Sequence, residues 1–104
     1  MKGLYKHARV DAGIEAIIAG GGDVVMLEAA VTRLRAGQKL NSPNFNDHPL
    51  AGRLAGLRSA VVGSTAERRT VVMVYRVTAR AVFIYMVDEH DAAYRKLIVE
   101  IKGH

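Results

Sequence analysis

Two apolar stretches joined by a short polar link dominate the second half of the chain. Residues 70–77 and 81–87 are rich in β-branched and aromatic side chains, which is typical of β-strands. The link at residues 78–80 is short enough to join the two stretches as a hairpin. Because each stretch is almost continuously apolar, both strands are expected in the interior of a sheet and not at its edge.

A single charged residue, Arg76, interrupts the first apolar stretch. Side chains alternate between the two faces of a strand, so the residues separate into two sets. One set is apolar and is expected to pack against helices: Val71, Met73, Tyr75 and Val77. The other is expected to form the floor of a site: Arg68, Thr70, Val72, Val74 and Arg76.

The register of the hairpin stays open at this point. A two-residue turn at residues 79–80 would put Phe83 and Tyr85 on the Arg76 face of the sheet. A three-residue turn would move both aromatic residues to the opposite face.

The first half of the chain predicts a short strand and two helices. Residues 4–10 alternate weakly. Asp11 is expected to cap a helix that ends at residue 19, and Asp23 is expected to cap a second helix over residues 24–36, closed by Gly37. The glycines at 20–22 predict a turn between these helices, because no GK[ST] motif follows them to form a phosphate loop. The two helices would pack as a hairpin on the apolar face of the sheet.

Loop-forming residues fill positions 38–49, and residues 57–62 predict a further strand. Residues 63–67 would form a turn into the central hairpin. After residue 90 the sequence predicts a helix capped by Asp91, with His90 and Tyr94 on one side of it; a last strand at residues 98–101 is the alternative. The expected fold is one α+β domain over residues 1–104, with two helices on an antiparallel sheet of about four to five strands and a short C-terminal helix.

Arginine is concentrated in the middle of a basic chain. The 104 residues carry a formal net charge of +5, and Glu67 is the only acidic residue between positions 53 and 80. Arginine suits bidentate contact with phosphate, so this region indicates a polyanionic partner; a solvated surface that keeps the protein in solution is the alternative. The residues concerned are Arg53, Arg58, Arg68, Arg69, Arg76 and Arg80.

The cysteine content and the spacing of the histidines limit the kinds of functional site that the chain can form. The chain has no cysteine and its histidines lack short metal-ligand spacing, so neither a metal nor another cofactor is expected. We see no signal peptide and no apolar segment long enough to span a membrane, which favours a cytoplasmic protein. Metal-free RNA cleavage needs a base, an acid and cations, and histidine and arginine are suited to those roles near neutral pH.

Short motifs in a fixed order resemble the RelE/ParE superfamily of type II toxins, and most closely its YafQ-like branch. They lie between about residues 45 and 96: DHPL at 47–50, Gly52, GLR at 56–58, VYRV at 74–77 and HDAAY at 90–94. The resemblance implies a RelE-like fold with a curved sheet. It also implies a ribosome-associated endonuclease that cuts mRNA, together with a cognate acidic antitoxin encoded beside it.

The same resemblance implies roles for individual residues. His48, His90, Arg76 and Tyr94 would be catalytic, with the two histidines sharing the acid and base roles. Arg53, Arg58, Arg68 and Arg69 would hold RNA or phosphate. The branch has a further histidine and an Asp-Trp pair that this chain lacks, so Arg68 or Arg69 is a possible substitute. A non-catalytic module, such as a ParE-like gyrase poison or an inactive relative, is the alternative.

Overall fold

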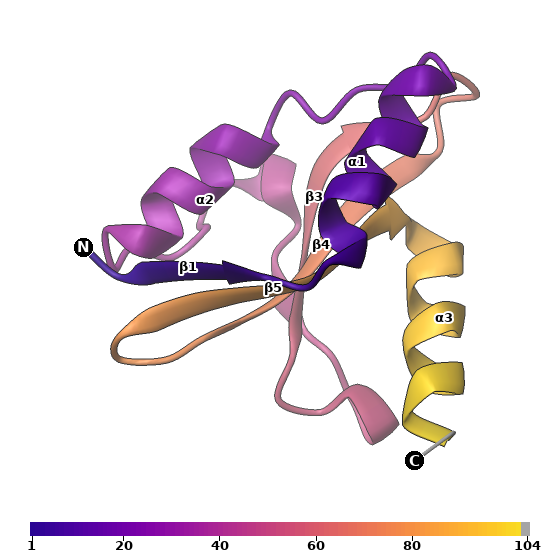
Figure 1. The fold of residues 1–104 in the computed structure, drawn as a ribbon. Coiled ribbons are helices and arrows are strands. Elements are labelled where there is room, and N and C mark those ends of the chain that lie inside the picture. Colours follow the sequence, from indigo (N-terminus) through magenta and orange to yellow (C-terminus); the bar gives the residue numbers. More distant parts are fainter. Residues whose placement is uncertain (103–104) are drawn as a thin grey trace.

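The computed structural model describes residues 1–102, with side chains through residue 98. It is a five-stranded sheet between two helical layers (Figure 1). The elements, in chain order, are β1 (Gly3–Lys6), α1 (Arg9–Ala19), α2 (Leu27–Arg35), the 3-10 turn η1 (Pro43–Phe45), β2 (His48–Pro49), η2 (Gly52–Leu54), β3 (Arg58–Ser64), β4 (Thr70–Val77), β5 (Ala81–Glu89) and α3 (His90–Lys102). None of these helices has the length and apolar character needed to cross a membrane.

The predicted hairpin is confirmed and occupies the interior of the sheet. The strand order is β1-β5-β4-β3-β2, so β4 is central and β5 also has a neighbour on each side. Arg76 pairs with Phe83 across the hairpin, which places this aromatic residue on the Arg76 face. A bulge interrupts the pairing of β4 with β5 just before Arg76, at the step from Val74 to Tyr75. The first of the two possible registers is therefore the one adopted for Phe83.

One strand pair differs from the expected antiparallel arrangement. β1 runs parallel to β5, with Tyr5 beside Phe83, whereas the other pairs are antiparallel. Parallel strands need a long connection, and both helices and three strands lie between β1 and β5 in the chain. The sheet is therefore mixed.

The expected cap of the first helix is wrong. α1 begins at Arg9, with Ala8 before it. Asp11 lies inside the first turn, where it forms an ion pair with Lys6 at 2.9 Å. The first strand is correspondingly shorter than residues 4–10 and ends at Lys6.

The expected cap of the second helix is also wrong, because the chain approaches β3 before the helix starts. Asp23 forms an isolated bridge with Ser64, and the N–H of Met26 donates to the carbonyl of Val62 at 3.0 Å. A Cβ at Gly63 would lie 2.0 Å from the carbonyl oxygen of Asp23. Glycine at this position permits the close approach, and the helix begins only at Leu27.

Several other boundaries agree with the sequence or shift by a few residues. Gly37 follows the second helix with φ +81°, as expected of a helix-ending glycine. β3 continues to Ser64, two residues beyond the prediction. The C-terminal segment is helical through residue 102, which excludes the alternative strand at 98–101. The expected cap by Asp91 is wrong, because the helix already starts at His90 and Asp91 lies in its first turn.

The two faces of the sheet carry separate cores. α1 and α2 cover one face, where Val71, Met73 and Tyr75 are buried as predicted; Val77 is 37% exposed. α3 covers the middle of the other face, over Val72 and Val74. The predicted floor is thus open only at its two ends, beside Thr70 and beside Arg76.

Candidate functional site

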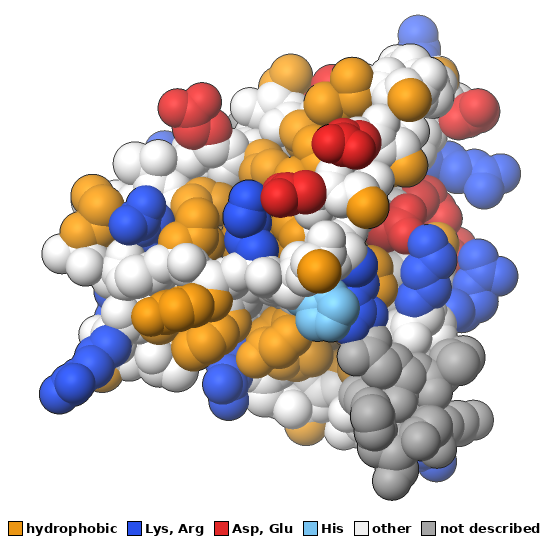
Figure 2. Space-filling view, viewed as in Figure 1, with side chains coloured by type: hydrophobic (Ala, Val, Ile, Leu, Met, Phe, Trp, Pro, Cys, Tyr) orange, Lys and Arg blue, Asp and Glu red, His pale blue; other side chains and the backbone are white. Residues whose placement is uncertain are grey.

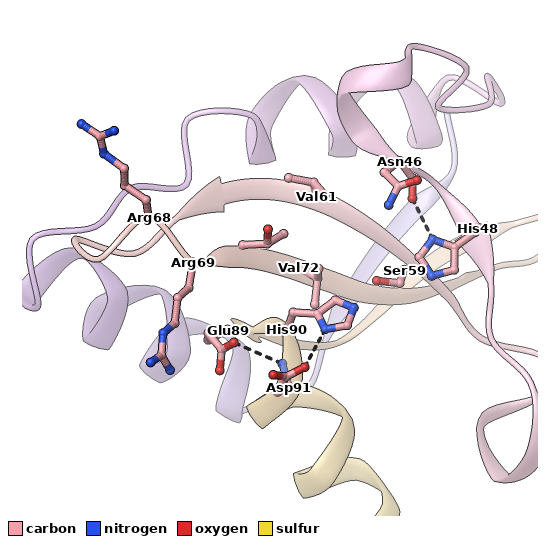
Figure 3. A pocket seen from close by; sticks show the side chains of 11 residues that line it. Asn46, His48, Ser59, Val61, Arg68, Arg69, Val72, Glu89, His90 and Asp91 are labelled. Carbon is pink, nitrogen blue, oxygen red and sulfur yellow. Dashed lines mark hydrogen bonds and ion pairs between the residues drawn. The ribbon is translucent and has the colours of Figure 1, made fainter.

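A cavity of about 520 Å³ lies at the open end of the sheet beside Thr70. Strands β2, β3 and β4 form its floor, and the start of α3 forms one wall (Figure 3). The lining residues are Asn46, His48, Ser59, Val61, Arg68, Arg69, Thr70, Val72, Glu89, His90 and Asp91. Two histidines far apart in the sequence therefore meet at one cavity.

His48 reaches the cavity from β2, beside Ser59 of β3. Its Nδ1 lies 2.8 Å from the carbonyl oxygen of Asn46 (Figure 3). A carbonyl oxygen can only accept a hydrogen bond, so Nδ1 carries the proton and the lone pair of the neutral ring is on Nε2. Asn46 has the left-handed φ of 42°, which turns the chain two residues before the histidine. This arrangement suits His48 to accept a proton.

His90 is the first residue of α3 and has a different partner. Its Nδ1 lies 3.0 Å from Oδ1 of Asp91, and its ring packs edge-on against Tyr94 with the centroids 4.5 Å apart. The hydrogen bond from His90, followed by smaller Coulomb attraction from His90, Arg95 and Arg69, lowers the pKa of Asp91. The carboxylate of Asp91 accepts a hydrogen bond from Nδ1 and so orients the ring, which leaves Nε2 of His90 to exchange a proton with a substrate.

Tyr94 is held beneath His90 by a residue that the motifs did not single out. The Tyr94 hydroxyl donates to Oγ of Ser59 at 2.9 Å, and Ser59 is fully buried. This bond links α3 to β3 directly under the cavity. The sequence feature that could have identified Ser59 is a serine at an alternating position within an apolar strand.

Two of the predicted phosphate-binding arginines line the same cavity. Arg68 and Arg69 belong to the turn between β3 and β4. Figure 3 shows their side chains extending in different directions from the end of the cavity opposite His48. Arg68 has a φ of 65°, a left-handed conformation that separates the two side chains. The structure thus brings together His48, His90, Tyr94, Arg68 and Arg69.

The other predicted site residues lie elsewhere. Arg76 does not line the cavity; its guanidinium lies over the ring of Phe83, 5.2 Å from the centroid. Arg53 lies in η2. Arg58 lies in β3 but pairs with Asp47 at 3.1 Å. The charge within β4 is therefore accommodated by an aromatic neighbour at the far end of the sheet.

A partly buried network anchors Asp47, the residue before His48. Asp47 accepts hydrogen bonds from the Tyr75 hydroxyl at 2.5 Å and from Arg58 at 3.1 Å. Burial first, and then the bond to Asp47, raises the pKa of Tyr75, while the bond to Asp47 raises the pKa of Arg58. The network fixes the backbone from which His48 projects. The alternation along residues 70–77 predicts only a core position for Tyr75. The aspartate next to His48 is the sequence feature that indicates a further contact.

Metal binding has no support in the part of the chain whose side chains are described. No group of three or more histidine, aspartate, glutamate or cysteine side chains there is arranged to hold a metal ion. The cavity offers imidazole and guanidinium groups beside the carboxylates of Glu89 and Asp91, and imidazole and guanidinium suit acid-base chemistry on an anion.

Known structures share this architecture, although no protein-family model and no curated protein sequence matches the chain. YafQ from Escherichia coli superposes with a TM-score of 0.74 at 16% identity, covering 90% of this chain and 99% of YafQ. YafQ in the E. coli DinJ-YafQ toxin-antitoxin complex gives 0.72 at 18% identity, covering 89% and 97%. A copper-bound mutant toxin from Helicobacter pylori gives 0.73 at 22% identity, covering 88% and 98%. The chain therefore has the fold of YafQ, and the RelE-like fold class predicted from its motifs is confirmed.

Proposed function

We propose that this protein is the toxin of a type II toxin-antitoxin pair and that it cleaves translated mRNA at the ribosome without a metal. The observation that carries the proposal is the meeting of His48 and His90 at one cavity, each with a different hydrogen-bond partner. A base and an acid on one substrate are the requirement for phosphodiester cleavage by neighbouring-group attack.

The chemistry assigns one proton transfer to each histidine. Nε2 of His48 takes the proton of the ribose 2′-hydroxyl, and the 2′-oxygen forms a bond to phosphorus. The bond from phosphorus to the 5′-oxygen then breaks, and Nε2 of His90 gives its proton to that leaving oxygen. The products are a 2′,3′-cyclic phosphate and a 5′-hydroxyl, so atoms and protons balance without any further reactant.

The arginines of the β3–β4 turn supply positive charge to the same cavity. Negative charge accumulates on the phosphorane oxygens during the reaction, and nearby guanidinium groups stabilise it. Arg68 and Arg69 line the cavity and are the groups we assign to this role. They occupy the place in the chain where the YafQ-like branch carries its Asp-Trp pair.

The structural relatives support the toxin role and an antitoxin partner. YafQ is described in a toxin-antitoxin complex with DinJ, and the H. pylori relative is described as a toxin. By the same logic, a small acidic antitoxin would bind this chain, whose net charge is +5. Messenger RNA and the ribosome are the further partners we propose, in the cytoplasm.

A cleavage assay with purified protein tests the chemistry. RNA incubated with EDTA should give fragments ending in a 2′,3′-cyclic phosphate, and His48→Ala and His90→Ala should each lower the rate by about 10²-fold or more. His7→Ala is the matched control, because His7 contacts Arg9 and does not line the cavity. Full activity in both cavity variants would refute the mechanism.

Expression in a bacterium tests the biological role. The wild-type chain should arrest growth with loss of intact mRNA, and the His90→Ala variant should not. Arrest accompanied by DNA damage, with mRNA intact, would refute the nuclease proposal and identify a gyrase poison on the same fold.

A further inference from the structure

Outside the cavity, three planar side chains form a row across the opposite end of the sheet. Tyr5 of β1 pairs with Phe83 of β5, and Phe83 pairs with Arg76 of β4. The Tyr5 and Phe83 rings are stacked, with centroids 5.3 Å apart and planes 19° apart. Arg76 lies over the other side of the Phe83 ring at 5.2 Å. We call these three residues the aromatic row.

The aromatic row has an open end at the edge of the sheet. β1 is an edge strand, and Tyr5 is 60% exposed. The ring spacing is close to the separation of neighbouring strands, roughly 4.8 Å, so the rings stand side by side with the outer side of Tyr5 facing away from Phe83. A further planar group stacked there would continue the row.

Gly3 leaves room for the Tyr5 ring. It is two residues before Tyr5 on β1 and therefore on the same side of the strand. A Cβ at Gly3 would lie 3.3 Å from Cε2 of Tyr5 and 3.8 Å from its hydroxyl oxygen. The ring thus leans over a position without a side chain, and a side chain there would crowd it.

The surroundings of the aromatic row are apolar and basic. Figure 2 shows hydrophobic side chains gathered over β1 and β5, with lysine and arginine side chains around them, whereas the acidic side chains in that view lie in its upper half. Arg80 is exposed at the adjoining hairpin turn. The charge complements a polyanion, and stacked planar groups complement unpaired bases.

We propose that the aromatic row is a second RNA contact, at which an unpaired base stacks on Tyr5 while Arg76 and Arg80 attract the phosphates. The proposal extends the RNA chemistry proposed above to a surface that does not line the cavity. The other four aromatic residues of the chain are Phe45 and Tyr75, which are buried, and Tyr85 and Tyr94, which pack against the core under α3. Tyr5 and Phe83 are thus the pair available for stacking.

A tryptophan reporter tests the proposal directly. The chain contains no tryptophan, so Tyr5→Trp introduces a single reporter at the end of the row. Single-stranded oligodeoxyadenylate should quench its fluorescence in a saturable manner. This probe has no 2′-hydroxyl, so the proposed cleavage cannot consume it, and binding is measured whether or not the protein is a nuclease. Phe83→Leu in the reporter protein should weaken binding by about tenfold or more.

Two controls separate base stacking from charge alone. Val25→Trp places the same reporter at a residue that is 79% exposed and outside the row; oligodeoxyadenylate should leave its fluorescence largely unchanged. Heparin, a polyanion without bases, should not quench Tyr5→Trp.

Three results would overturn the proposal: no quenching of Tyr5→Trp, equal quenching of both reporters, or equal quenching by heparin. Quenching by an acidic antitoxin but not by the oligonucleotide would assign the surface to the protein partner instead. Saturable quenching in a protein that does not cleave RNA would support base stacking at the aromatic row and refute the nuclease proposal. The two proposals can therefore fail separately.

Discussion

Removing the hydroxyl of Tyr75 tests how His48 is held in place. Tyr75→Phe keeps the ring, which is 1% exposed, and so leaves no large cavity in the core. It deletes the hydrogen bond to Asp47 Oδ1. Arg58 still contacts Oδ2 of Asp47 at 3.1 Å, so the carboxylate keeps one charged partner.

The expected loss of stability follows from these contacts. A hydrogen bond to a charged group contributes about 1.5–3 kcal/mol, whereas leaving a buried charge wholly unpaired costs roughly 3–5 kcal/mol. Because Asp47 remains paired, we expect the free energy of unfolding to fall by about 2 kcal/mol. In a domain of this size the melting temperature should fall by roughly 8–16 °C.

The raised pKa of Tyr75 determines how the stability difference between wild type and Tyr75→Phe changes with pH. Burial and the bond to Asp47 raise the pKa of Tyr75 above the ordinary value of 10.0, so the folded state favours the neutral phenol. That contribution is fully present below about pH 10 and is lost as the pH rises further, because the unfolded chain releases the proton first. The stability difference between wild type and Tyr75→Phe should therefore be constant up to about pH 10 and shrink above it.

Urea unfolding at a series of pH values measures this difference. Tyr85→Phe is the matched control, because Tyr85 lies on the neighbouring strand and its hydroxyl makes no hydrogen bond among the described residues. We also expect Tyr75→Phe to slow RNA cleavage well below its melting temperature, whereas the control should not. A stability loss no greater than that of Tyr85→Phe, or a difference that grows above pH 10, would refute the reasoning.

Two further variants test the site and the fold. Asp91→Asn replaces the charged acceptor that orients the His90 ring, so the RNA cleavage rate should fall by about tenfold or more; an unchanged rate would contradict the role given to this contact. Gly63→Ala should lower the free energy of unfolding by more than about 2 kcal/mol, because its Cβ would lie 2.0 Å from the Asp23 carbonyl oxygen. Gly20→Ala, whose Cβ would approach no atom closer than 3.4 Å, should cost less than about 1 kcal/mol by the same urea measurement.

Local pattern was sufficient for the centre of the fold. The run from Thr70 to Val77 alternates on an apolar background and is followed at once by a second such run, so pairing between them needs no distant information. The same alternation identified Val71, Met73 and Tyr75 as the surface under the helices. Local pattern cannot predict contacts between distant segments. Asp23 has a side chain typical of a helix cap, but a bridge to Ser64 holds its backbone away from the helix.

The part of the site that could be predicted from the sequence is the part whose motifs lie on or next to strands. His48 lies on β2 and His90 directly follows β5. Both histidines lie on the side of the sheet that carries Ser59. Their shared cavity also depends on α3 turning back over Val72 and Val74, which no local pattern specifies. The network of Asp47, Tyr75 and Arg58 was missed for the same reason, since its members lie in three separate segments.

Arg76 shows why a charge in an apolar strand does not by itself locate a catalytic site. Alternation correctly places it on the face opposite the two-helix layer, but α3 covers the middle of that face and leaves two open ends. The histidines occupy one end, and Arg76 lies at the other, over Phe83. Arg76 is exposed to solvent, and the face of the Phe83 ring supplies a favourable neighbour for its guanidinium. Arg76 therefore belongs to the RNA contact proposed at the aromatic row, and not to the cavity proposed for cleavage.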